Sequence, residues 1–143
     1  MRKRLERQDA IKRIVRNERV KTQRALVDNL KADGFVCTQA TVSRDITEMG
    51  LKKLPEGVYV LAEDLHLQRM VSDLVTDVKL SEKFVLVKAS AGTAPGVAAA
   101  LDAAEIDGIL GSVAGDDTIL VITVSDADAA LLVDTLDKFR GVN

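Results

Sequence analysis

The segment Gly115-Asp116-Asp117-Thr118 places two adjacent carboxylates between two apolar runs of the chain. Because Gly and Asp are common turn formers, the simplest interpretation is a solvated turn between two strands. Adjacent carboxylates also suit a guanidinium or ammonium group, so a cation-binding site is a second interpretation. Metal or acid–base chemistry is a third, but the one histidine, His66, lies about 50 residues upstream. The residue types alone leave these interpretations open.

A second group of chemically capable side chains surrounds Arg44. Val42, Ile46 and Met49 fall on one side of a helix at about 100° per residue, which predicts a buried stripe. Arg44 then points away from that stripe, where an arginine can pair bidentately with guanine O6 and N7. The alternative is a solvated arginine that pairs with Glu48 at i+4.

The polar residues around Arg44 fit the same role, because Gln39, Thr41 and Ser43 can reach phosphates or base edges. Three helices and a hairpin must position them. The first is predicted over about residues 5–17, from an apolar stripe formed by Leu5, Ile11, Ile14 and Val15. Two more are predicted behind the N-caps Thr22 and Thr38, ending near Gly34 and Met49.

Residues 51–61 predict the hairpin, since two short runs flank the turn Pro55-Glu56-Gly57. Two helices joined by a short turn with Gly are typical of a helix-turn-helix, and a following hairpin makes it winged. Lys52 and Lys53 would lie on the wing, and Cys37 would be a small buried residue in the turn. This context favours DNA reading by Arg44 over the solvated alternative.

The second half predicts an α/β sandwich behind a connecting helix. Residues 62–66 are polar and are interpreted as a linker. Apolar residues at Leu67, Met70, Leu74 and Val78 predict an amphipathic helix. The remaining elements are expected as a buried strand at 84–87, a helix at 95–104, strands at 108–114 and 118–124, and a helix at 127–139.

Charge separates the two halves. Residues 1–61 hold 14 Lys and Arg against 8 Asp and Glu, a net charge of +6, whereas residues 62–143 hold 6 against 14, a net charge of −8. The basic excess is greatest in residues 1–24, with ten basic and three acidic side chains. Opposed halves indicate two modules with different partners, the basic one suited to phosphate.

Composition also excludes several classes of protein. One cysteine and one histidine give neither an internal disulfide nor a metal cluster. An aromatic content of 3% argues against a protein that stacks single-stranded bases. The basic start has no apolar segment typical of a signal peptide, and no run approaches the roughly 20 residues of a membrane span. We therefore expect a cytoplasmic protein with no metal and no membrane partner.

Two extended motifs carry a resemblance to a known family. The segment from Thr38 to Ile46, TQATVSRDI, resembles the recognition helix of bacterial arginine repressors. Gly92-Thr93-Ala94, Ala100-Leu101-Asp102 and the segment from Ile109 to Leu120 resemble the arginine-binding core of that family. The motifs occur in the expected order, and the likeness covers essentially the whole chain.

The resemblance implies a homohexamer of two stacked trimers, with L-arginine bound between trimers as corepressor. It implies that the ligand site is lined by Asp102, Ser112, Ala114, Asp116 and Asp117. It also implies operator contacts by Gln39, Ser43 and Arg44, with Thr41 beside them. Two positions depart from the family pattern: Ser112 replaces the usual Thr, and Pro95 replaces a residue that is often polar. Pro95 offers neither a side-chain hydrogen bond nor an N–H, so we expect arginine either to bind more weakly or to be supported differently there.

These inferences predict an α+β protein of two domains. Residues 1–66 would form a winged helix-turn-helix that binds double-stranded operator DNA, and residues 67–143 a domain for oligomerisation and arginine binding. The expected function is arginine-dependent control of arginine biosynthesis genes, with catabolic genes as a second target. The alternatives are the same two-module plan with a different effector, and a small α/β enzyme fused to a winged helix. An enzyme would need an acid–base set beyond Asp116 and Asp117, so no catalytic residue is expected.

Overall fold

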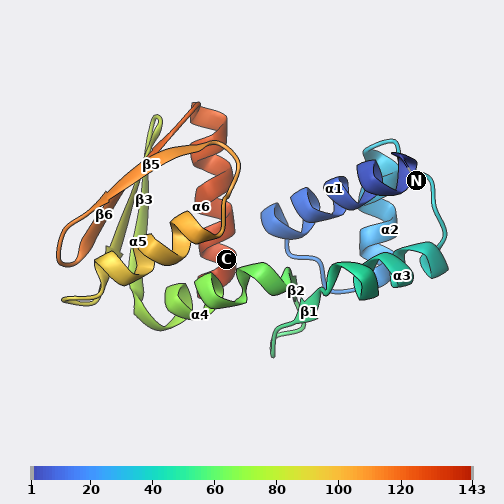
Figure 1. Cartoon of the computed structure of the whole chain (residues 1–143), viewed down its shortest axis with the longest axis horizontal. Coiled ribbons are helices and arrows are strands. Elements are labelled where there is room, and N and C mark those ends of the chain that lie inside the picture. Colours follow the sequence, from blue (N-terminus) through green and yellow to red (C-terminus); the bar gives the residue numbers. More distant parts are fainter. Residues whose placement is uncertain (1, 143) are drawn as a thin grey trace. The chain divides into compact units, whose positions relative to one another are not determined.

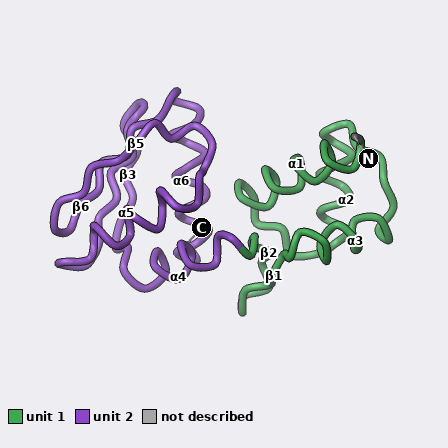
Figure 2. The backbone as a smooth tube through the Cα atoms, in the orientation of Figure 1, with its two compact units in different colours: residues 1–62 green, residues 63–143 purple. Residues whose placement is uncertain are grey.

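The computed structural model describes residues 2–142, and the chain folds into two compact units, Met1–Ala62 and Glu63–Asn143 (Figure 2). The first unit holds three helices and a two-stranded sheet, and the second holds three further α-helices and a four-stranded sheet (Figure 1). The predicted α+β class is confirmed.

The first unit contains α1 (Arg2–Asn17), α2 (Gln23–Ala32) and α3 (Gln39–Met49). Both predicted N-caps are confirmed: the hydroxyl oxygens of Thr22 and Thr38 accept hydrogen bonds from the backbone N–H groups of Ala25, at 3.0 Å, and Thr41, at 3.2 Å. Each cap satisfies an N–H that the first turn of a helix leaves unpaired. The short strands β1 (Lys52–Lys53) and β2 (Tyr59–Val60) then pair antiparallel as a hairpin.

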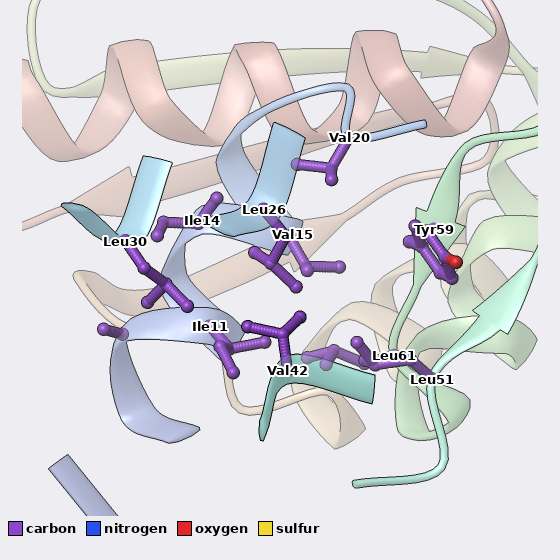
Figure 3. Packing of buried hydrophobic residues seen from close by; sticks show 11 residues of the cluster. Ile11, Ile14, Val15, Val20, Leu26, Leu30, Val42, Leu51, Tyr59 and Leu61 are labelled. Atoms are coloured by element: carbon purple, nitrogen blue, oxygen red, sulfur yellow. The ribbon is translucent and has the colours of Figure 1, made fainter. Parts of the chain in front are cut away.

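A core of aliphatic side chains and Tyr59 joins these elements (Figure 3). Ile11, Ile14 and Val15 of α1 are buried as predicted, together with Leu26 and Leu30 of α2 and Val42 of α3. Leu5 was expected in the same stripe, but that prediction is wrong, since Leu5 is 54% exposed. The packed face of α1 begins further along the helix. Cys37, expected to be buried, is half-buried against the core.

A 3-10 helix (Ala62–Asp64) and the start of α4 (Leu65–Leu74) span the boundary between the two units, so the segment 62–66, interpreted as a linker, is helical. The predicted helix through Val78 is also too long, because Val75–Ser81 forms strand β3. Val75, Thr76 and Val78 are β-branched, which favours extended backbone. Val78 pairs with Val87 in the sheet, so its helix-like spacing from Leu74 is coincidental.

The four-stranded sheet is antiparallel throughout, in the order β3-β4-β6-β5. Its other strands are β4 (Phe84–Ala89), β5 (Ile109–Ala114) and β6 (Thr118–Thr123), and the remaining helices are α5 (Ala94–Ala103) and α6 (Asp126–Arg140). Helix α5 packs against β5 and β6, and α6 against β3 and β4. Figure 1 shows these helices lying along the sheet.

The two faces of this sheet differ. The helix-covered face is a buried core that includes Val85, Val87, Ile119 and Val121. The outer face carries large apolar side chains that are open in the single chain: Phe84 is 42% exposed, Leu120 37% and Val113 67%. The segment 84–87, predicted to be a buried strand, is therefore buried only at alternate positions.

Candidate nucleic-acid interface and ligand site

Helix α3 presents its polar residues to solvent. Arg44 and Gln39 are exposed, and Thr41 and Ser43 are half-buried. Opposite Arg44, Val42 is fully buried, as the helical spacing predicted. Ile46 and Met49 are only partly buried, although both pack against the core. Within residues 2–142, Arg44 makes no side-chain hydrogen bond or ion pair, so its five N–H donors are open to a partner.

Glu48 does not pair with Arg44, the alternative that the i+4 spacing allowed. Its carboxylate lies 3.9 Å from Arg4 Nη1 and accepts a 2.9 Å hydrogen bond from Gln8 Nε2. Both partners are on α1, so Glu48 connects two helices instead of neutralising the exposed arginine. Arg44 keeps its full charge available at the surface.

Asp45 is a functional candidate that the sequence reasoning missed. Its side chain is 2% exposed and receives two hydrogen bonds from the guanidinium of Arg7, one of them 2.9 Å from Nη2 to Oδ1. Gln8 Nε2 donates a third, 3.0 Å long, to Oδ1. Burial would raise the pKa of Asp45, but the Arg7 and Gln8 hydrogen bonds and the Arg7 charge outweigh it and lower that pKa. Asp45 is therefore a buried, ionised carboxylate.

The helical spacing of the sequence does place Asp45 on the buried side of its helix. Residue 45 follows Val42 by three positions and precedes Met49 by four, so it lies on the inward stripe. A carboxylate there requires a partner, because a buried charge without one is costly. Its partner Arg7 is one of the ten basic residues of the segment 1–24, and its guanidinium binds Asp45 within the unit instead of standing open to phosphate.

The hairpin carries two exposed lysines, Lys52 and Lys53. The ammonium of Lys53 lies 5.1 Å from the centroid of the Tyr59 ring, within range of a cation–π contact. This contact spans the hairpin, since Lys53 and Tyr59 are paired residues of β1 and β2. The hairpin thus presents positive charge at its surface.

In the second unit, Asp116 and Asp117 are exposed in the tight connection between β5 and β6. A 2.8 Å hydrogen bond from Gly115 N–H to the Thr118 carbonyl closes this turn. Thr118 Oγ1 donates to Asp117 Oδ1 at 2.8 Å, and Lys88 Nζ lies 3.8 Å from the same oxygen. The Thr118 hydrogen bond and then the Lys88 charge hold the pKa of Asp117 below its ordinary value.

The backbone of this turn is attached to the loop before α5. Ala94 N–H donates to the Asp116 carbonyl at 3.1 Å, and Ala89 N–H to the Asp117 carbonyl at 2.8 Å. Gly92 has a φ of +79°, and a Cβ built there would lie 4.0 Å from Asp116 Oδ1. The Gly92-Thr93-Ala94 segment and the two aspartates are therefore brought together, with exposed Pro95 beside them in the first turn of α5.

Of the other predicted ligand residues, Asp102 lies near the end of α5, and Ser112 and Ala114 lie on β5. Exposed Asp102 accepts a 3.3 Å hydrogen bond from Ser112 Oγ on β5, and Ala114 is half-buried at the end of that strand. Asp102 is eight residues from Ala94, or about 12 Å at 1.5 Å per helical residue. One chain thus presents carboxylates near both ends of α5.

Among the described residues, no group of three or more His, Cys, Asp and Glu could hold a metal ion. Over the same part of the chain, no helix is long and apolar enough to cross a membrane.

Comparison with known proteins finds a matching family model for each of the two units. The family model for the arginine repressor DNA-binding domain matches residues 1–67, and that for the arginine repressor C-terminal domain matches residues 71–138. The arginine repressor of Thermus thermophilus is 43% identical over 148 residues, covering 96% of this chain and 88% of the relative. That of Carboxydothermus hydrogenoformans is 37% identical, covering 94% of this chain and 97% of the relative.

These matches identify a DNA-binding transcription regulator with two structural units. The chain belongs to the arginine repressor family, which confirms the resemblance of its motifs.

Proposed function

We propose that this protein is an arginine-responsive transcription regulator that binds operator DNA with L-arginine as corepressor. It would control arginine biosynthesis genes, with catabolic genes as a second target, and it would catalyse no reaction. The observation that carries the proposal is the exposed, unpaired Arg44 on the outer face of α3. Family membership supports the same conclusion.

In this proposal α3 reads bases in the major groove. Arg44 pairs with a guanine, and Gln39, Thr41 and Ser43 contact base edges or phosphates around it. The hairpin lysines and the exposed basic residues of α1 bind phosphates, so the affinity falls steeply with salt. Residues 1–66 act as this DNA-binding domain.

L-arginine binds, in this proposal, through Asp102, Ser112, Ala114, Asp116 and Asp117. The carboxylates meet its guanidinium and α-amino groups, and the backbone near Ser112 and Ala114 fixes its orientation. Because one chain presents these carboxylates near both ends of α5, a ligand held between copies would bring complementary sets together. Arginine would then stabilise the assembly that binds it.

The assembly proposed is a homohexamer of two trimers, formed by residues 67–143. The apolar outer face of the sheet supports self-association, because soluble monomers rarely expose contiguous apolar patches of several side chains. The acidic charge of this part of the chain explains why neither nucleic acid nor a membrane is proposed as its partner. We propose a cytoplasmic location.

The test measures binding to a duplex from the protein's own upstream region by gel shift, with and without L-arginine. L-arginine should tighten specific binding, whereas L-citrulline, which lacks the guanidinium charge, should not. A response to another amino acid would favour the alternative of a different effector. Specific binding that no amino acid changes would overturn the corepressor proposal.

A further inference from the structure

We infer that Asp45 is a positioning residue for DNA reading, and that its ion pair with Arg7 fixes the direction in which α3 presents Arg44. The inference rests on the proposed role of α3 in base recognition. Asp45 contacts no DNA in this scheme, because its side chain faces α1 and is 2% exposed. It would act through its neighbour Arg44.

The geometry is that of an orienting contact. The Nε and Nη2 atoms of Arg7 each meet a different oxygen of the Asp45 carboxylate, and Gln8 adds a third donor. A planar guanidinium that binds both oxygens of a carboxylate fixes direction as well as distance. The residues are 38 positions apart in sequence, so the contact joins the start of the unit to its third helix.

A second contact one turn further along α3 restrains the same rotation. Gln8 Nε2 also donates to Glu48 at 2.9 Å, and Arg4 Nη1 approaches the other oxygen of Glu48 at 3.9 Å. Two residues of α3 spaced by three positions are thus attached to one face of α1. Because these contacts lie at two positions along α3, they restrain both the rotation of α3 about its axis and its sliding along α1.

A small rotation of α3 would disturb base reading. With an outer helix radius of about 5–6 Å, a turn of about 20° moves a side-chain tip by about 2 Å. A bidentate arginine–guanine pair needs donor–acceptor distances near 2.9 Å, so such a shift breaks it. Buried ion pairs often contribute little net stability compared with apolar residues of similar size. Orientation of α3 therefore explains better than added stability why a charged Asp45 occupies a buried position among the apolar residues of this helix.

The effect of Asp45→Asn on net charge distinguishes a positioning role of Asp45 from a role in the stability of the domain. Asp45→Asn removes one negative charge from the DNA-binding unit, which favours binding to any duplex. The same change removes the two-oxygen contact that orients α3, which disfavours the correct base sequence. Non-specific affinity should therefore stay equal or rise while specific affinity falls. A merely destabilised domain would lose both affinities together.

The experiment uses the full-length protein with L-arginine, an operator duplex and a scrambled duplex at one fixed salt concentration. Fluorescence anisotropy gives both dissociation constants, and circular dichroism confirms folding. We expect Asp45→Asn and Arg7→Gln each to lower the specific-to-non-specific affinity ratio about tenfold or more. Arg7→Lys keeps the positive charge but loses the planar guanidinium that binds both carboxylate oxygens, so it should lower the ratio by an intermediate factor.

Arg13→Gln is the matched control. It removes the same charge from the same helix, but Arg13 pairs with Asp33 only at the surface, with Nη2 3.9 Å from the carboxylate and 59% of the Arg13 side chain exposed. This variant should weaken binding to both duplexes about equally and leave the ratio unchanged. A ratio that falls equally in Arg13→Gln and Arg7→Gln would overturn the inference.

A double-mutant cycle with Arg44→Ala tests whether Asp45 acts through Arg44. If it does, Arg44→Ala should cost much less discrimination in the Asp45→Asn background than in the wild type. Additive losses would overturn the positioning role, as would a ratio within twofold of wild type in folded Asp45→Asn and Arg7→Lys. If the wild type itself does not prefer the operator duplex, the proposed function fails. If it does and the variants match it, only this inference fails.

Discussion

The two units of this protein complete their polar contacts differently. In the first, the buried carboxylate of Asp45 has three hydrogen-bond donors from within the same chain. In the second, Asp102, Asp116 and Asp117 are exposed, and the sheet carries an open apolar face. In the first unit, contacts within a single copy hold helix α3 in place. The second presents charges and apolar surface that a single copy leaves in water.

This difference fits the two tasks of the proposed function, DNA reading by one unit and ligand-dependent assembly by the other. Under the proposed function, specific DNA reading requires a fixed direction for a few side chains, and the contacts of Arg7 and Gln8 with Asp45 would supply it before DNA binds. The proposed ligand-dependent assembly would require the opposite, since carboxylates and apolar side chains that face water in one copy remain available to a ligand or to another copy.

Leu120→Asp should abolish assembly. Leu120 lies in the outer face of the sheet and is 37% exposed, so in an oligomer built on that face the new carboxylate would be buried without a partner. Replacing a buried Leu also loses about 1.5–3 kcal/mol of apolar transfer free energy per copy. Sedimentation velocity should show the wild type as a hexamer and the variant as smaller species.

Leu131→Asp is the control for Leu120→Asp. Leu131 is similarly exposed, at 43%, but lies on α6, on the helix-covered side of the sheet. It should leave the assembly intact. Dissociation by Leu131→Asp with no effect of Leu120→Asp would assign the interface to the helices and contradict our comparison of the two faces.

Arg44→Ala should weaken operator binding by about 1–3 kcal/mol, the range for one bidentate base contact, without unfolding the domain. Arg24→Ala is the control, because Arg24 is an exposed arginine on α2 and its loss should act only through net charge. Anisotropy titrations at fixed salt measure both. Operator affinity within twofold of wild type in Arg44→Ala would remove Arg44 from base reading.

The sequence predicted elements better than it predicted contacts between them. Thr22 and Thr38 were recognisable as N-caps because a cap depends on residues three positions apart. Strand β3 was missed because Leu67, Met70, Leu74 and Val78 continue a helical spacing past the true end of α4 at Leu74. Pairing with β4, which determines the strand, is not a local property.

The candidate sites show the same limit. Arg44 could be placed opposite Val42 from helical geometry alone, whereas the partner of Asp45 lies 38 residues away. The run Phe84–Val87 is continuously apolar, so nothing in it showed that one side of β4 faces the helices and the other does not. The roles of the residues predicted to bind arginine stay predictions, although the structure places Ser112 in contact with Asp102.

Asp117→Asn should weaken L-arginine binding about tenfold or more, because it removes a charged hydrogen-bond acceptor while keeping the shape of the side chain. It should change the stability of the ligand-free protein much less. Calorimetry with L-arginine and L-citrulline measures the effect, and citrulline should bind poorly to the wild type. Equal binding of the two ligands, or an unaffected variant, would show that the carboxylates only form a turn.

Lys88→Met should have the smallest effect, and in the opposite direction from Asp117→Asn. Lys88 Nζ lies 3.8 Å from Asp117 Oδ1 and donates a 2.6 Å hydrogen bond to Thr118 Oγ1, so it partly neutralises the carboxylate that an incoming guanidinium would meet. Its removal should tighten L-arginine binding. The gain should stay below about fivefold, because exposed ion pairs are screened by solvent.

The pH dependence of L-arginine binding tests the same contact independently of affinity. In the wild type the Thr118 hydrogen bond and then the Lys88 charge lower the pKa of Asp117, so the carboxylate stays ionised below its ordinary range. Binding that depends on this charge is present above the lowered pKa and is lost as the pH falls through it. Without Lys88 that pKa moves back up, and calorimetry over a pH series should show Lys88→Met losing L-arginine binding at a higher pH than the wild type. Identical pH profiles would mean that Lys88 does not influence the ligand-binding carboxylate.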